Sequence, residues 1–228
     1  MIKELNDRLD KTGLFVRGGF YPSVADEVPR LPNGKKAETV ILIGNAGVEL
    51  WRSFQEQAVL SRKQPLDSWL RSVIEGLSEC VGAHMLLPNE GPPFIPIQKW
   101  AMRAEPVYRS PIGILIHPEY GLWHVYRAAL IFSTRLALPI RSHNTSPCAT
   151  CRTRPCLSVC PADAFLPDRF DASSCVSHVE SNAGKNCLDK GCLARRACPV
   201  GKEYRYEVAQ QAFHTHAMVR AVKSGFGG

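Results

Sequence analysis

Eight of the nine cysteines in this chain of 228 residues lie within 51 consecutive residues, and this concentration restricts how the C-terminal part can fold. Clustered thiols form disulfides mostly in secreted proteins and bind metal mostly inside cells. The charged N-terminus, Met1–Arg8, is unlike a signal peptide, and no apolar run is long enough to span a membrane. We therefore expect a soluble, cytoplasmic protein without a membrane partner, whose thiols bind metal. The ninth cysteine, Cys80, is expected to be a small buried apolar residue.

The eight cysteines form two groups, and each group ends in a Cys-Pro pair: Cys148, Cys151, Cys156 and Cys160, then Cys175, Cys187, Cys192 and Cys198. In two-cluster ferredoxins, three closely spaced cysteines bind one 4Fe-4S cluster and the Cys-Pro cysteine binds the other. By this rule Cys198 joins Cys148, Cys151 and Cys156, whereas Cys160 joins Cys175, Cys187 and Cys192. Three of the gaps are two residues longer than in bacterial ferredoxins. Two structural zinc sites with four cysteines each are the alternative.

The first 145 residues alternate between helical and strand-like patterns. Thr39–Ile43 is short and rich in β-branched residues, which predicts a buried strand. Apolar residues at helical spacing from Trp69 to Leu77 predict a helix that Asp67 or Ser68 would cap. The glycine- and proline-rich stretch 18–34 predicts a loop. Further helices are predicted over 2–12, from 48 onward, over 96–104 and over 207–222, and further strands over 84–87, 112–117 and 123–131.

These patterns predict a mixed α/β domain built on one sheet. The chain contains neither a Walker A loop nor a Gly-x-Gly-x-x-Gly motif, so no phosphate-binding motif supports a nucleotide site. The net charge is +7, and residues 141–228 hold 12 Lys and Arg against 7 Asp and Glu. A basic surface attracts nucleic acid or acidic proteins, although thiolate-bound clusters, which are themselves anionic, would neutralise part of the excess.

Residues 148–199, including Asp171–His178, resemble the two-cluster ferredoxin domain of epoxyqueuosine reductases and the related reductive dehalogenases. In those enzymes a lone cysteine follows the first Cys-Pro pair by about fifteen residues, as Cys175 does here. The resemblance implies two 4Fe-4S clusters that deliver electrons to a cobalamin on an adjoining nitroreductase-like domain. It also implies a proton-donating residue in the loop before the 96–104 helix, where this chain carries Glu90 but not the aspartate of that family.

Residues 38–135 are similar to a second group, the cobalamin-processing (CblC-type) proteins, which remove the upper ligand of cobalamin on a flavin-reductase-like fold. The resemblance rests on Pro65-Leu66-Asp67 and above all on the stretch Ile116–Trp123 followed by Arg127. In that family the matching arginine lies near a thiol-substrate site.

Both resemblances imply a corrinoid, whose broad apolar ring needs an aromatic and aliphatic pocket with few polar groups. The candidate residues for binding it are Trp100, Met102, Ile116, His117, Tyr120, Trp123 and Arg127. Each has an ordinary structural alternative: the apolar residues would fill a core, His117 would belong to a turn, and Arg127 would form an ion pair. A flavin in place of the corrinoid is a further alternative.

The sequence thus predicts an α+β protein: a nitroreductase- or flavin-reductase-like corrinoid domain over 1–145, a ferredoxin-like domain with two 4Fe-4S clusters over 146–205, and a C-terminal helix over 206–228. Its predicted function is to pass electrons from the clusters to cobalamin for reductive cobalamin processing. The alternatives are an epoxyqueuosine-reductase-like tRNA-modifying enzyme and a plain ferredoxin-type carrier. The expected partners are a flavodoxin- or ferredoxin-type electron donor, cobalamin and a second copy of the chain. tRNA is a further partner if the chain is a tRNA-modifying enzyme.

Overall fold

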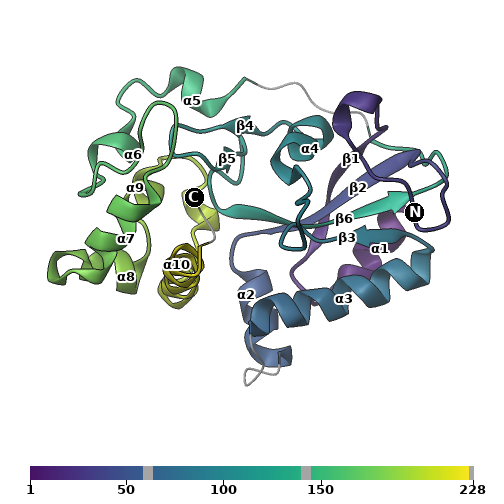
Figure 1. The fold of residues 1–228 in the computed structure, drawn as a ribbon, viewed down its shortest axis with the longest axis horizontal. Coiled ribbons are helices and arrows are strands. Elements are labelled where there is room, and N and C mark those ends of the chain that lie inside the picture. Colours follow the sequence, from purple (N-terminus) through teal and green to yellow (C-terminus); the bar gives the residue numbers. More distant parts are fainter. Residues whose placement is uncertain (59–63, 140–144, 226–228) are drawn as a thin grey trace. The chain divides into compact units, whose positions relative to one another are not determined.

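The computed structural model describes residues 1–58, 64–139 and 145–225 (Figure 1). The chain divides into two compact units. Unit 1 comprises Met1–Pro106 and His124–Asn144, and unit 2 comprises Val107–Trp123 and Thr145–Gly228. No helix in the described ranges combines the length and the apolar character needed to cross a membrane.

Unit 1 is built on a four-stranded antiparallel sheet in the order β1-β2-β6-β3. Its strands are β1 (Phe15–Phe20), β2 (Thr39–Ala46), β3 (His84–Leu86) and β6 (His124–Phe132). Residues 40–43 of β2 have no exposed surface, because this central strand is covered on both faces. The predicted strands at 39–43, 84–87 and 123–131 are confirmed.

Among the described residues, four α-helices accompany this sheet: α1 (Ile2–Leu9), α2 (Glu49–Gln57), α3 (Pro65–Val81) and α4 (Ile97–Ala104). Figure 1 shows α4 on one side of the sheet and α1 and α3 on the other. All four helices were predicted from the sequence. α3 starts two residues before Asp67, because Pro65 occupies its first turn, where the missing N–H group is not needed.

Two predictions for unit 1 were wrong. β1 extends over Gly18, Gly19 and Phe20, where the predicted loop begins, and Gly18 approaches α4 so closely that a Cβ atom there would lie 2.7 Å from the Ala104 carbonyl oxygen. The glycine that suggests a loop is therefore required by close packing of a strand. Cys80 is exposed, not buried, because it follows the last buried positions of α3, Leu77 and Ser78.

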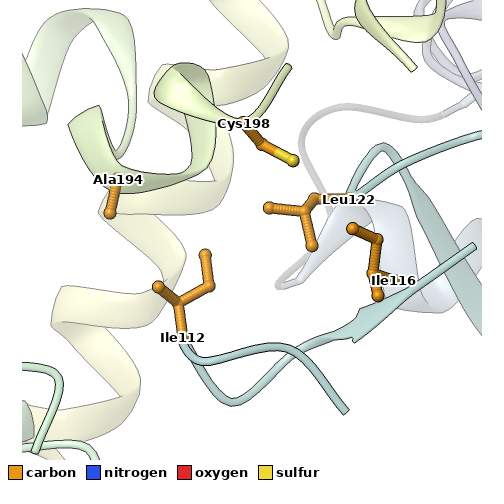
Figure 2. Packing of buried hydrophobic residues seen from close by; sticks show 5 residues of the cluster. All are labelled: Ile112, Ile116, Leu122, Ala194 and Cys198. Atoms are coloured by element: carbon orange, nitrogen blue, oxygen red, sulfur yellow. The ribbon is translucent and has the colours of Figure 1, made fainter. Parts of the chain in front are cut away.

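Unit 2 begins with a hairpin over residues 107–123, formed by β4 (Tyr108–Arg109) and β5 (Leu115–Ile116) in a separate two-stranded sheet. The strand predicted over 112–117 is confirmed for residues 115–116, but the prediction of a single sheet was wrong, because this strand pairs with β4 in a second sheet. Leu122, Ile112 and Ile116 of this hairpin pack against Ala194 and Cys198 (Figure 2). This apolar contact is the reason why the hairpin belongs to the cysteine-rich unit, although the sequence suggested a boundary near residue 145.

The other α-helices of the described structure lie in the rest of unit 2. They are α5 (Pro147–Thr150), α6 (Pro155–Ser158), α7 (Ala172–Glu180), α8 (Lys185–Lys190), α9 (Leu193–Ala197) and α10 (Val208–Lys223). Val219 of α10 packs with Val176 and Val179 of α7 and with Cys187 of α8. The predicted C-terminal helix is confirmed, and it forms part of the same compact unit as the cysteines.

Candidate metal centre

The first thiol set consists of Cys148, Cys151, Cys156 and Cys198, which surround a small cavity of about 20 Å³. α5 and α6 are single turns that start with a proline and position Cys148 and Cys156. The Ser146 hydroxyl caps α5 by accepting a hydrogen bond from the Cys148 amide, with a nitrogen–oxygen distance of 3.3 Å. Burial raises the pKa of Cys148, and the neighbouring thiols Cys198, Cys156 and Cys151 raise it further.

The second thiol set consists of Cys160, Cys175, Cys187 and Cys192, which line a cavity of about 470 Å³. Burial raises the pKa of Cys175 to about 11, with further contributions from Cys192, Cys160 and Cys187. Burial also raises the pKa of Cys192, while hydrogen bonds from the backbone amides of Arg195 and Ala194 act in the opposite direction. Those amides belong to the first turn of α9, for which Cys192 is the N-cap residue.

The structure thus brings together the same two sets of four that the ferredoxin rule predicts. Repulsion between thiolates raises the cost of ionisation within each set, and a bound cation would reverse this effect by stabilising the thiolate form. Within the described residues, no three His, Cys, Asp or Glu side chains converge as ligands of a single metal ion. The thiols of each set lie around a cavity, and the species that they bind stays a prediction.

The 107–123 hairpin is held next to the first thiol set by its backbone as well as by its apolar residues. Gly121 has φ +56°, and a Cβ atom at this position would lie 2.0 Å from the Val200 carbonyl oxygen. Arg195 of α9 donates two hydrogen bonds to the Leu122 carbonyl oxygen, at 3.0 and 2.6 Å. Its guanidinium also lies 4.6 Å from the centres of the Trp123 and Tyr206 rings.

His117 shapes the turn of this hairpin. Its Nδ1 atom accepts hydrogen bonds from the backbone amides of Glu119 and Tyr120, at 3.1 and 3.2 Å. Its ring stacks on the Tyr120 ring, with 4.4 Å between ring centres. These contacts agree with the turn role that the sequence allowed for this residue.

The residues predicted to bind a corrinoid are divided between the units. Unit 1 contains Trp100, Met102 and Arg127, and unit 2 contains Ile116, His117, Tyr120 and Trp123. Trp100, Ile116 and Trp123 are at most 1% exposed, because each packs into the core of its own unit. The Trp100 indole donates a hydrogen bond to the Asp26 carbonyl oxygen at 2.7 Å, and Arg127 donates one to the Asn45 side chain at 3.0 Å. Corrinoid binding by these residues stays a prediction.

A buried polar network in unit 1 was not predicted from the sequence. Arg17, whose side chain has no exposed surface, forms an ion pair of 2.7 Å with Glu105. Tyr126 donates a hydrogen bond to the same carboxylate, and Arg17 also contacts the His124 ring at 3.3 Å. Burial raises the pKa of Glu105, although the charge of Arg17 and the hydrogen bond from Tyr126 oppose the shift. Only the isolated arginine in an otherwise apolar β1 could have signalled this network.

Comparison with solved structures finds chains with a similar fold. An epoxyqueuosine reductase from Bacillus subtilis shares 15% sequence identity and aligns over 92% of this chain and 68% of its own, with a TM-score of 0.53. An epoxyqueuosine reductase in complex with an epoxyqueuosine-modified tRNA-Tyr stem loop shares 17% identity over the same fractions, with a TM-score of 0.52. No family model and no curated protein sequence matches the chain. At these identities the similarity shows a shared fold: this mixed α+β chain has the fold of the epoxyqueuosine reductases.

Proposed function

We propose that this chain is an iron–sulfur oxidoreductase of the epoxyqueuosine-reductase type, in which unit 2 holds two 4Fe-4S clusters and supplies electrons to a corrinoid. The observation that carries the proposal is the separation of eight thiols into two sets of four, each around its own cavity, within one compact unit. Four thiolates are the ligand set of one cubane cluster. Each cluster, once bound, accepts and releases one electron at a time, which is chemistry that the protein itself lacks.

The residues around the thiols would support bound clusters in two ways. Backbone amides hydrogen-bond to cysteine sulfurs at the first turn of α9 and after Cys198, and such bonds stabilise thiolates and tune cluster potentials. The hairpin covers the first set with Ile116 and Leu122, so that water is kept from one side of it. The donor set, its amide hydrogen bonds and its apolar cover all fit an iron–sulfur centre.

We propose an epoxyqueuosine-type nucleoside in RNA as the substrate. Reduction of its epoxide to an alkene consumes two electrons and two protons and releases water. Two observations support this substrate. One of the solved structures with a similar fold is bound to a tRNA stem loop. Unit 2 also carries exposed basic residues, among them Arg152, Arg169 and Lys185, which could contact phosphates. Glu90, in the loop before α4, would supply a proton, and it forms an ion pair with Arg71 on α3.

Reductive cobalamin processing is the second candidate, and the Ile116–Trp123 stretch favours it. This stretch carries the resemblance to cobalamin-processing proteins, and its residues pack against Cys198 of the first thiol set. In this reading the electrons would remove the upper cobalt ligand, and no RNA would be involved.

The first experiment is to purify the protein without oxygen and count its metals. Two clusters require about eight irons per chain, whereas two zinc ions per chain and no iron would refute the proposal. Cys156→Ala and Cys175→Ala should each remove about half of the iron, because they belong to different thiol sets. Cys80→Ala, at an exposed position outside both sets, is the matched control and should retain all of it.

The second experiment separates the two candidate functions. The iron-loaded protein is supplied with cobalamin and a chemical reductant and given either an epoxyqueuosine-containing RNA stem loop or an alkylcobalamin. Conversion of the nucleoside, and its loss in Glu90→Gln, support the first candidate. Dealkylation without nucleoside conversion supports the second. A protein that carries eight irons but does not change the cobalamin spectrum would be a plain electron carrier.

A further inference from the structure

The cavity at the second thiol set is much larger than the cavity at the first. Both cavities are bordered by four cysteines, but their volumes are about 470 and 20 Å³. A cluster bound by the second thiol set would occupy part of the larger cavity, but the cavity also extends away from the thiols to the 107–123 hairpin and to α10. A volume of several hundred cubic ångströms is typical of pockets for small organic ligands.

The walls of this larger cavity are mostly apolar and come from several segments of unit 2. Ile112 and Ile114 of the hairpin and Met218 of α10 line it. Phe165 and Phe170 also line it, and their rings are stacked at an interplanar angle of 26° with 5.3 Å between centres. Flat aromatic walls favour a flat, conjugated ligand, because offset stacking adds to the burial of apolar area.

A few polar side chains line the same cavity, as in most pockets that orient a ligand. They include Gln211, His214 and Thr215 on α10, His178 on α7 and Arg195 on α9. The Gln211 amide and the Thr215 hydroxyl donate hydrogen bonds to backbone oxygens, which fixes their orientation. The Arg195 guanidinium is itself held by the Leu122 carbonyl oxygen, so the side chain forms a fixed part of the wall.

We propose that this cavity binds a planar, conjugated two-electron carrier, such as a quinone or the isoalloxazine ring of a flavin, directly beside the second thiol set. The inference rests on the proposed function in that the thiols hold a cluster. The reduced carrier gives up two electrons, one to each cluster, and its two protons pass to water. The site would thus be an entry point for electrons that requires no donor protein.

The test measures binding by the anaerobically purified, iron-loaded protein. Menadione is the quinone probe and lumiflavin is the isoalloxazine probe, each titrated in its oxidised form by calorimetry, with lumiflavin also followed by fluorescence quenching. We expect saturable binding of one molecule per chain for at least one probe, and the probe that binds identifies the class of carrier. Absence of saturable binding for both probes would refute the proposal.

Substitutions on α10 locate the binding. Thr215→Trp fills the cavity and should weaken binding by about tenfold or more, which corresponds to about 1.4 kcal/mol. The matched control His216→Trp adds the same side chain at the adjacent, exposed position and should bind normally. Unchanged affinity in Thr215→Trp would show that the probe binds elsewhere and would overturn the proposal.

Iron content distinguishes failure of the carrier proposal from failure of the proposed function. Thr215→Trp should keep the iron content of the wild type, and Met218→Trp serves as a second cavity-filling variant if it does not. If the wild type contains no iron, the proposed function fails, and the titrations still decide whether the cavity binds a carrier.

Discussion

Tyr126 on β6 donates a hydrogen bond to the carboxylate of Glu105, which directly follows α4. The buried guanidinium of Arg17 pairs with the same carboxylate and lies 4.8 Å from the Tyr126 ring centre. Three segments of unit 1 that are distant in sequence therefore meet at one carboxylate. A carboxylate, an arginine and a phenol can share a buried site only because each forms an ion pair or a hydrogen bond with another member of the group.

Replacing Arg17 should destabilise unit 1 strongly. Arg17→Met leaves the buried Glu105 without its cation, and loss of one partner of a buried pair costs about 3–5 kcal/mol of unfolding free energy. Urea denaturation followed by circular dichroism measures this loss. The control is Arg8→Met, which removes an exposed ion pair with Glu4 and should cost no more than about 0.5 kcal/mol. Equal effects of the two substitutions would contradict the buried arrangement.

Glu105 should make the folded state less stable as the pH rises. Burial raises its pKa above the ordinary value of 4.5, despite Arg17 and Tyr126, so the folded state binds the proton more tightly than the unfolded state. The stabilisation of the folded state by proton binding at Glu105 is therefore complete below pH 4.5, and it is lost as the pH rises through the folded-state pKa. Glu105→Gln cannot titrate and should lack this dependence. Unfolding free energies of both proteins over a pH series test this, and parallel curves would contradict it.

Asp26 should have the opposite pH dependence. Burial alone would raise its pKa, but hydrogen bonds from Ser23 and the charge of Arg103 outweigh this effect and lower it. Its stabilisation is therefore present above the ordinary pKa of 3.8 and is lost as the pH falls through the lower, folded-state value. Asp26→Asn should cost about 1–3 kcal/mol near neutral pH. Denaturation at neutral and strongly acidic pH measures this cost, which should shrink in acid; a constant difference would argue against a lowered pKa.

Gly121 should tolerate no side chain. Gly121→Ala combines a positive φ with a Cβ atom 2.0 Å from the Val200 oxygen, so the hairpin would have to move away from the segment after Cys198. We expect a loss of more than about 2 kcal/mol in stability, together with loss of iron from the first thiol set. Gly113→Ala is the matched control, because its φ is +81° but no atom lies within 4 Å of its Cβ position. Its cost should stay near 1 kcal/mol, as thermal melts and iron analysis of both variants can show.

Much of the secondary structure was predictable because it depends on short-range patterns. β2 is marked by its run of β-branched residues, and α3 by apolar residues at helical spacing. The two thiol sets were predicted by applying the ferredoxin rule to the two Cys-Pro groups, although three of the gaps are longer than in bacterial ferredoxins. These features need no knowledge of which distant segments meet.

The tertiary structure decided features that depend on contacts between distant segments. It made the glycine-containing stretch 15–20 an edge strand that pairs with β2, in which Gly18 and Gly19 lie too close to α4 and β2 for a side chain. It joined the 107–123 hairpin to the cysteine-rich unit through the contacts of Ile116 and Leu122 with Cys198. It also buried Arg17 beside Glu105, 88 residues later in the chain. These features depend on close approach, apolar packing and the pairing of buried charges. Such interactions join segments that are far apart in the sequence, so local sequence patterns do not identify the partners.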